Sequence, residues 1–348
     1  MNEYKILGVK NLPNSEVEIE VEVSAEYLQS FWSKAITHVG EHVEIAGFRK
    51  GHIPENVLVT KVGEMAIIEE SAEMALAEVY PKVVIEKNIN AIGRPKVTIT
   101  KMAKGSPLNF KAITAIVPEV KLPNYKKIAK DTLSKEETIV VDEKEIEEVI
   151  MEIRKSKAPH DHDEQGNHLP PKDSDLPEFT DEFVKSLGAD FASVEDFKTK
   201  ARERITEEKK YRAIEKRRME ILEAIAEKTK TELPEILVES EIDKTFSQFA
   251  ENLKSMGLEV ADYLKRIQKT EEDLRKEWRP EGEKRAKIQL VINQIALEEK
   301  ISPTKEEVEK ESKHLIEQYK DADPRRVMIY VETMLVNEKV LVMLEGQK

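Results

Sequence analysis

This 348-residue chain has no cysteine, and it has few glycines (12) and few aromatic residues (5%). Without cysteine, disulfide bonds, thiolate catalysis and cysteine-ligated zinc are excluded. No apolar run approaches the roughly 18 residues of a membrane-spanning helix, and the amino terminus leads into no apolar segment. We therefore expect a cytoplasmic protein without a membrane span. The scarcity of aromatic residues and glycine favours helices over an all-β structure.

The chain also lacks an excess of positive charge, because 56 lysines and arginines stand against 69 acidic residues and leave a net charge of −13. A general nucleic-acid binder needs a broad basic face, so that class is not favoured. An RNA-rich partner would have to be met through a small basic patch such as Arg49 and Lys50. With 39% hydrophobic and 36% charged residues, the chain is long enough for two or three domains with apolar cores.

Residues 1–117 have the pattern of an α+β domain. Residues 15–23 alternate valine or isoleucine with glutamate, the period-2 pattern of a strand with one solvent-facing side. Ser24 is placed to cap a helix whose apolar stripe includes Phe31 and Trp32, which we expect in the core. Further helices are expected over residues 54–62 and 64–88, and further strands over residues 96–100 and 108–117. This order predicts helices packed on one side of an antiparallel sheet.

Residues 47–54 read Gly-Phe-Arg-Lys-Gly-His-Ile-Pro and lie between two predicted helices. Glycine tolerates backbone angles that other residues resist, and proline fixes φ and lacks a donor, so this segment should be an exposed loop. Phe48 offers an apolar anchor, and Arg49 and Lys50 offer two charges. This combination suits docking on an acidic or nucleic-acid-rich surface. The alternative is a surface turn in which Phe48 folds back on the core.

Residues 118–157 are expected to be a linker followed by the first helix of a second region. Two prolines and no sustained period mark the linker up to about residue 135. Residues 137–141 are expected to form a brief strand, and Asp142 is placed to cap a charged helix that ends near Lys157.

Residues 158–175 form a polar segment bounded by proline and glycine that carries three of the seven histidines. With acidic neighbours, His160, His162 and His168 could supply ligands to Zn²⁺ or Ni²⁺. Their spacing matches no structural or catalytic metal motif, so an ordinary loop is the simpler interpretation. We expect no metal or cofactor.

Residues 176–348 have helical patterns throughout, joined by short loops. Residues 194–225 predict a long helix, and a narrow apolar stripe that begins after Pro234 and ends at Gly257 is typical of a slender arm. Thr270 with Asp273, Thr304 with Glu307, and Asp323-Pro324 predict three further helix starts, whereas Pro280 should kink or break a helix. The region has no phosphate loop, nucleophile elbow or His-Glu-x-x-His motif, so we expect no catalytic residues.

Methionine and aliphatic residues lie beside charge in this helical region, a composition that suits an adaptable surface with many weak partners. Five methionines are the clearest examples: Met219, Met256, Met328, Met334 and Met343. Each one taken alone is more simply a core residue. Thin helical arms cannot bury all of their apolar area, however, so the set as a whole predicts exposed apolar patches.

The segment 47–54 resembles the ribosome-docking signature of the trigger factor family, Gly-Phe-Arg-x-Gly-x-x-Pro. All of its fixed positions are present, at Gly47, Phe48, Arg49, Gly51 and Pro54. The resemblance extends over most of the chain and implies an ATP-independent chaperone with an α+β ribosome-binding domain followed by a mostly helical, arm-bearing domain. It implies as partners the ribosome at its exit tunnel, through protein and rRNA, and unfolded or nascent polypeptides. It also allows a homodimer off the ribosome.

The chain departs from this family in one place. The family carries an inserted peptidyl-prolyl isomerase domain of the FKBP type where residues 158–175 stand here. Only about 35 residues separate Ile139 from Leu176, too few for an ordinary domain, and no aromatic residue occurs from Lys126 to Glu178. We therefore expect no isomerase activity and divide the chain at residues 117, 157 and 175.

Two other functions remain open on the sequence alone. The first is a free cytosolic holdase or assembly scaffold whose loop no longer docks, although the intact motif in residues 47–54 argues against it. The second is a metal-dependent enzyme at the segment from His160 to His168, for which no supporting base or nucleophile is visible.

Overall fold

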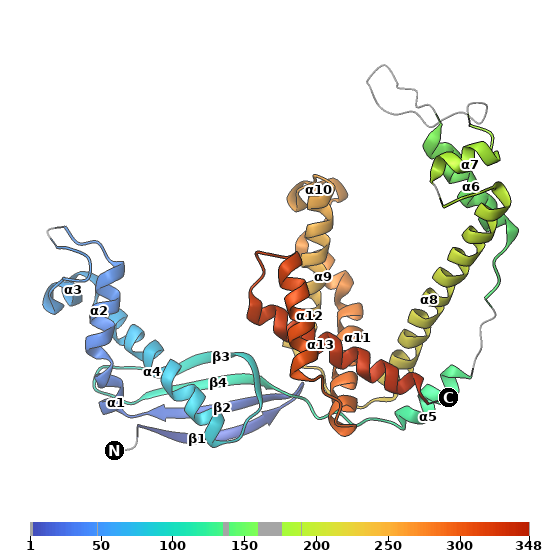
Figure 1. Cartoon of the computed structure of the whole chain (residues 1–348). Coiled ribbons are helices and arrows are strands. Elements are labelled where there is room, and N and C mark those ends of the chain that lie inside the picture. Colours follow the sequence, from blue (N-terminus) through green and yellow to red (C-terminus); the bar gives the residue numbers. More distant parts are fainter. Residues whose placement is uncertain (1–2, 47, 135–138, 159–175, 189, 348) are drawn as a thin grey trace. The chain divides into compact units, whose positions relative to one another are not determined.

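The computed structural model describes residues 3–46, 48–134, 139–158, 176–188 and 190–347 (Figure 1). Contacts divide the chain into two compact units, and each unit combines two separate segments. The first unit joins Met1–Pro123 to Lys228–Leu297, and the second joins Asn124–Glu227 to Glu298–Lys348. The sequence-based division at residues 117, 157 and 175 stays a prediction.

The amino-terminal part of the first unit is a four-stranded antiparallel sheet with helices on one face, as the sequence predicts (Figure 1). The strand order is β1-β2-β4-β3. The strands are β1 (Tyr4–Leu12), β2 (Glu16–Val23), β3 (Ala91–Lys101) and β4 (Leu108–Ile116). Valine and isoleucine of β2 and alternate residues of β4, including Phe110, are buried against α4 (Glu64–Glu86). The four glutamates of β2 occupy the opposite face, since successive side chains of a strand point to opposite sides.

The strand β1 is missing from the sequence-based prediction, which gives only three strands. Its pairing with β2 has a register shift between Ile6 and Gly8. Apolar residues of β1 lie on both of its faces, since Ile6 is half-buried whereas Leu7 and Val9 are exposed, so the sequence shows no period-2 pattern.

Three short helices precede α4: α1 (Ala25–Ser30), α2 (Trp32–His42) and α3 (Glu55–Val62). Ser24 caps α1 by accepting a hydrogen bond from the backbone N–H of Tyr27, as expected. The single helix expected from Ser24 is interrupted at Phe31, which is buried in the core under the sheet. Trp32 is half-buried against a second small core formed by α2, α3 and α4.

The carboxy-terminal segment of the first unit contains α9 (Glu235–Ser255), α10 (Val260–Ile267) and α11 (Glu271–Glu298). The predicted capping pair at the start of α11 is present, because the backbone N–H groups of Thr270 and Asp273 each donate to the other's side chain. Of the kink or break expected at Pro280, the break is wrong, since α11 continues through this residue, and the kink stays a prediction. Gly282, two residues after Pro280, is buried, and a Cβ there would lie 3.0 Å from Ile242 of α9. The two helices therefore approach closely at this point.

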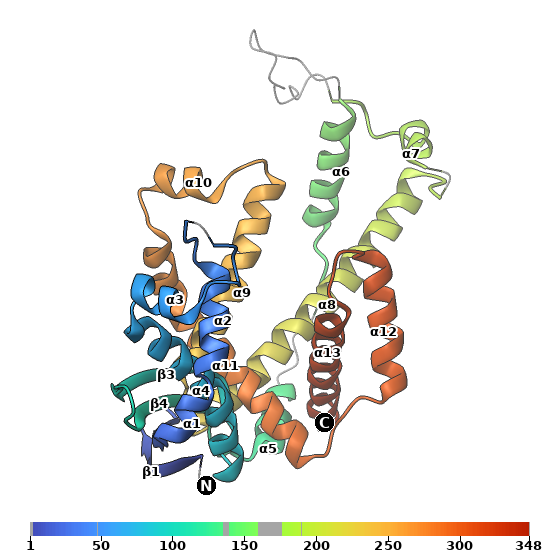
Figure 2. The same ribbon diagram turned by 90° about the vertical axis from the view of Figure 1, so that its left-hand side faces the viewer.

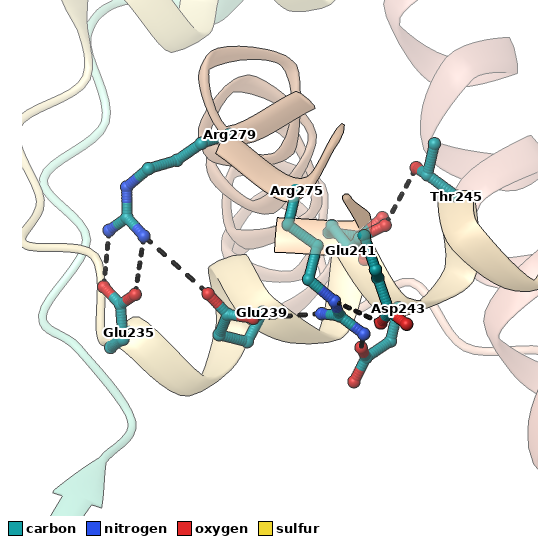
Figure 3. Close-up of polar contacts among 8 residues, drawn as sticks. Glu235, Glu239, Glu241, Asp243, Thr245, Arg275 and Arg279 are labelled. Atoms are coloured by element: carbon teal, nitrogen blue, oxygen red, sulfur yellow. Dashed lines mark hydrogen bonds and ion pairs between the residues drawn. The ribbon is translucent and has the colours of Figure 1, made fainter. Parts of the chain in front are cut away.

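An ion-pair ladder lines the flank of this pair of helices (Figure 3). Arg279 of α11 donates two hydrogen bonds of 2.6 Å to Glu235 of α9. One turn away, Arg275 pairs with Asp243 at 2.7 Å and with Glu239 at 3.3 Å. The guanidinium of Arg279 lowers the pKa of the Glu235 carboxyl, because it stabilises the charged form.

The second unit contains α5 (Tyr125–Leu133), α6 (Glu143–Lys157), α7 (Asp181–Leu187), α8 (Val194–Lys228), α12 (Lys305–Gln318) and α13 (Pro324–Glu345). Asp142 caps α6 and Thr304 caps α12, each with a complete capping box. The helix α5 lies in the predicted linker, where Asn124 caps it, so the linker expectation is wrong there. The brief strand expected over residues 137–141 is also wrong for 139–141, and its first two residues lie outside the described part.

A cluster of charges joins α8 to α13. Arg218 has little exposure and contacts Glu338 at 3.0 Å, Glu345 at 2.9 Å and Glu215 at 3.1 Å. Hydrogen bonds to Glu345 contribute most to raising the pKa of Arg218 above its usual value. Removal of this arginine would leave three carboxylates close together, so it fixes the end of α13.

Candidate functional site

The segment between α2 and α3 holds the motif singled out in the sequence. The helix α2 ends at His42, and Val43 already has an extended backbone. At the other side, Pro54 precedes α3, and its carbonyl accepts a hydrogen bond from the N–H of Leu58. The structure therefore places the motif in an irregular segment between two helices, as the glycines and the proline predict.

Two contacts hold the base of this segment. The side chain of Ile53 is buried in the second core together with Leu58 and Ile67. The backbone N–H of Gly51 donates to the carbonyl of Gly40 in α2 at 3.0 Å. The segment is thus fixed at its base, on the side of α3, by apolar burial and a backbone hydrogen bond.

The tip of the segment carries Phe48, Arg49 and Lys50. Phe48 is 42% exposed and belongs to neither core of the domain, so the alternative in which it folds back on the core is not supported. Its N–H donates to the carbonyl of Ile45 at 3.1 Å, which orders the backbone at the tip. Gly47 lies outside the described residues.

The two cations of the tip differ in their surroundings. The ammonium of Lys50 lies 2.7 Å from Glu44, and both side chains are exposed. Such a pair contributes little, because water and salt screen it. Within the described residues, Arg49 is exposed and makes no ion pair or side-chain hydrogen bond. A partner can therefore engage Arg49 without first breaking another contact.

A second candidate surface lies at the start of α13. The sequence pattern did not identify the residues that form it as a group. The helix packs on α12 (Figure 2), and Lys339 of α13 pairs with Glu307 of α12 at 2.9 Å. Val331 is buried, whereas three apolar neighbours in the first turns are exposed: Met328 (44%), Ile329 (65%) and Tyr330 (63%). We call these three residues the α13 patch. They occupy more of the helix circumference than one partner helix can cover.

The methionines leave apolar surface exposed, as expected for the set, whereas the expectation of patches stays a prediction and the expectation for single residues is corrected. Met219, Met256, Met328 and Met334 are exposed, so their individual placement in a core is wrong. Met343 is half-buried. The reason is geometric, since a pair of helices buries one stripe of each and leaves the remainder in water.

Aromatic residues gather on the pair α9 and α11. The rings of Phe249 and Trp278 lie 5.5 Å apart, and Tyr263 of α10 lies 5.5 Å from Phe249. All three are half-buried. This cluster stiffens the end of the pair and leaves aromatic edges at the surface.

In the described part of the chain, no group of three or more His, Cys, Asp or Glu side chains is arranged to hold a metal ion. The histidine-rich segment from His160 to His168 lies outside that part, so its metal hypothesis stays untested. Among the described helices, none is both long and apolar enough to cross a membrane.

Two family models match the chain. The model for the bacterial trigger factor protein (TF) matches residues 7–153, and the model for the bacterial trigger factor protein (TF) C-terminus matches residues 193–344. Only residues 154–192 lie between the two matches.

Individual relatives agree with these matches. The trigger factor of Halothermothrix orenii is 25% identical over 400 residues, covering 93% of this chain and 92% of the relative. The trigger factor of Clostridium kluyveri is 25% identical over 419 residues, covering 97% of each chain. Both alignments are longer than the 348 residues of this chain, so part of each relative has no counterpart here.

A solved structure shares the fold. It is described as "Promiscuous Substrate Recognition in Folding and Assembly Activities of the Trigger Factor Chaperone". The TM-score is 0.54 at 22% identity, with 98% of this chain and 99% of the other covered. Together, the fold and the matches place the chain in a class of bacterial molecular chaperones. The chain belongs to the trigger factor family.

The backbone of Gly51 provides a test of how the loop is held. Its φ of +76° lies in the left-handed region, which costs other residues about 1–2 kcal/mol. Replacing Gly51 with alanine should weaken its hydrogen bond to Gly40 and speed amide hydrogen exchange over residues 45–54 roughly tenfold. Exchange detected by mass spectrometry measures this.

The matched control is Gly105→Ala, in the turn before β4, where φ is +67° and the surrounding space is open. That variant should speed exchange only near its own turn. Unchanged exchange over residues 45–54 in the Gly51 variant would show that this glycine does not hold the loop.

Proposed function

We propose that this protein is an ATP-independent chaperone that docks at the ribosome exit tunnel and shields apolar segments of nascent chains in the cytoplasm. Membership of the trigger factor family supports the chaperone role. The single observation that supports docking is the exposed tip of residues 48–50 on an ordered base.

The docking residues proposed are Gly47, Phe48, Arg49, Lys50, Gly51 and Pro54. Phe48 would bury its ring in an apolar hollow of a ribosomal protein, and the two cations would pair with acidic side chains or rRNA phosphates. Arg49 is the stronger cation for this role, because its fork donates to two oxygens at once and it has no competing partner in the described residues.

Clients would be bound through exposed apolar surface, to which the α13 patch contributes three consecutive exposed residues. An unfolded segment that covers Ile329 and Tyr330 removes apolar area of the chaperone and of the client from water. Binding of the unfolded state disfavours collapse and aggregation by mass action. Because ordering an unfolded chain is costly, micromolar affinity is expected.

Two alternatives follow from the sequence. A free cytosolic holdase or assembly scaffold would use the same apolar surface without the loop, and ribosome binding distinguishes it from the proposal. A metal-dependent enzyme at His160–His168 would show turnover that a chelator abolishes. We also propose a homodimer off the ribosome as a further state that the resemblance allows.

The loop assignment predicts the behaviour of a triple variant. Replacing Phe48, Arg49 and Lys50 with alanine should reduce co-sedimentation with ribosomes at least about tenfold, because anchors of this kind dominate an interface. Helix content should not change, since Phe48 belongs to neither core.

The control removes one apolar and two basic residues elsewhere on the same domain, by Arg94→Ala, Ile99→Ala and Lys101→Ala on β3. These side chains are exposed in the same way. Retained ribosome binding by the loop variant, or equal loss in the control, would refute the docking role of the loop.

The α13 patch predicts a loss of client protection. Replacing Met328, Ile329 and Tyr330 with serine should raise the concentration that half-suppresses aggregation of a diluted, denatured protein roughly tenfold. Light scattering measures this, and ATP should have no effect on either protein.

A matched control replaces three scattered exposed residues, Ile85, Val117 and Tyr211, with serine. They have similar or greater exposure but form no patch. If this control loses as much protection as the patch variant, clients are not held at α13.

We expect no prolyl isomerase activity. Only residues 154–192 lie between the matched family models, fewer than the roughly 50 residues of the smallest ordinary domains. A protease-coupled assay with a proline-containing peptide should show only the uncatalysed isomerisation, which takes tens of seconds or longer. Faster conversion would reveal an isomerase site in this chain.

A further inference from the structure

A groove of about 570 Å³ opens between α6, the end of α7 and α8 in the second unit. Its wall is apolar and is supplied by Val149 and Ile153 of α6, by Phe191, and by Phe197, Ala201 and Ile205 of α8. The volume lies within the range of about 300–1,000 Å³ of ligand pockets. Neither the α13 patch nor the loop of residues 47–54 contributes to it.

The groove has an ordered wall. The rings of Phe191 and Phe197 lie 5.1 Å apart, and Phe197 also contacts Phe179 at 5.2 Å. Ion pairs also bridge α6 and α8, with Glu143 lying 2.6 Å from Arg202 and Glu145 lying 2.7 Å from Lys209. The aromatic contacts therefore order the wall of the groove, and these solvent-accessible ion pairs add a small stabilisation.

The rim of the groove is positively charged. It carries Lys157, Lys200 and Arg204 against the single acid Glu208, whose charge is paired with Arg212 at 2.5 Å. Lys200 is paired with Asp196 at 3.0 Å. Within the described part of the chain, Lys157 and Arg204 are exposed and have no ion pair. Two cations that have no ion pair among the described residues thus border an apolar wall.

This charge is opposite to that of the chain as a whole, which is −13. An acidic unfolded segment is repelled by most of the surface but attracted at this rim. We propose that the groove binds an extended client segment whose apolar side chains are flanked by carboxylates. The apolar residues fill the wall, and the carboxylates pair with Lys157 and Arg204. This assignment of a client class rests on the proposed function.

The test is isothermal titration calorimetry of the full-length protein with three nine-residue peptides. Each has a central Leu-Phe-Leu-Leu-Leu run, with two Asp, two Asn or two Lys residues at each end. The Asp peptide should bind about tenfold more tightly than the Asn peptide at low salt, and added salt should reduce this preference. Equal binding of all three peptides would overturn the proposal.

Two charge-reversal variants locate the site. In Lys157→Glu with Arg204→Glu, the preference should invert toward the Lys peptide. In the control, Lys155→Glu with Lys210→Glu, it should persist, because these exposed lysines lie on the same two helices without lining the groove. Both pairs change the net charge equally, and all substituted residues are exposed, so circular dichroism should show an unchanged fold.

Three further outcomes separate this proposal from the proposed function. The α13 patch variant should bind the Asp peptide normally while it loses aggregation suppression. If it loses both, the peptide binds at α13 and the groove proposal is wrong, although the chaperone proposal stands. If the Asp peptide binds only after residues 160–175 are deleted, the groove is occupied by the chain's own acidic segment, and the proposal is again wrong.

Discussion

A pair of helices can bury only the stripe along which the two helices touch, and this constraint governs the helical part of the protein. In the pair α9 and α11, Gly282 permits close contact with Ile242, and ion pairs from Arg275 and Arg279 close the flank. In the pair α12 and α13, buried residues such as Val331 occupy the contact stripe. Apolar residues outside that stripe remain in water, so the exposed apolar surface follows from packing helices in pairs.

Local signals in the sequence were sufficient wherever a structure depends on neighbouring residues. The alternation of residues 15–23 predicted β2, and the side chains of Ser24, Asp142 and Thr304 predicted helix starts that the structure confirms. These features are fixed by hydrogen bonds or burial within a few residues. The turn chemistry of residues 47–54 likewise predicted an irregular, exposed segment, whereas its ribosome-binding role stays a prediction.

Features that depend on contacts between distant residues could not be predicted from local sequence patterns. Apolar residues on both faces hide the pattern of β1, which is held in place as a strand by its pairing with β2. Pro280 is tolerated because tertiary packing holds α11 together on both sides of it. The groove beside Phe197 is formed by α6, the end of α7 and α8 together. The sequence pattern reveals only the apolar stripe of α8 and not the segments that face it. The exposure of Met328 could not be predicted without knowing which face of α13 is covered by α12.

Each of the two units is built from segments that are far apart in the sequence, and this affects how the protein itself is synthesised and folds. Each unit combines an early segment with a late one, since Met1–Pro123 is completed by Lys228–Leu297 and Asn124–Glu227 by Glu298–Lys348. Translation proceeds from the amino terminus, so the sheet can form early, but neither unit is complete until its second segment has left the ribosome. Contacts between residues more than a hundred positions apart also form slowly. The newly made chain therefore exposes unfinished surface until its last helix emerges.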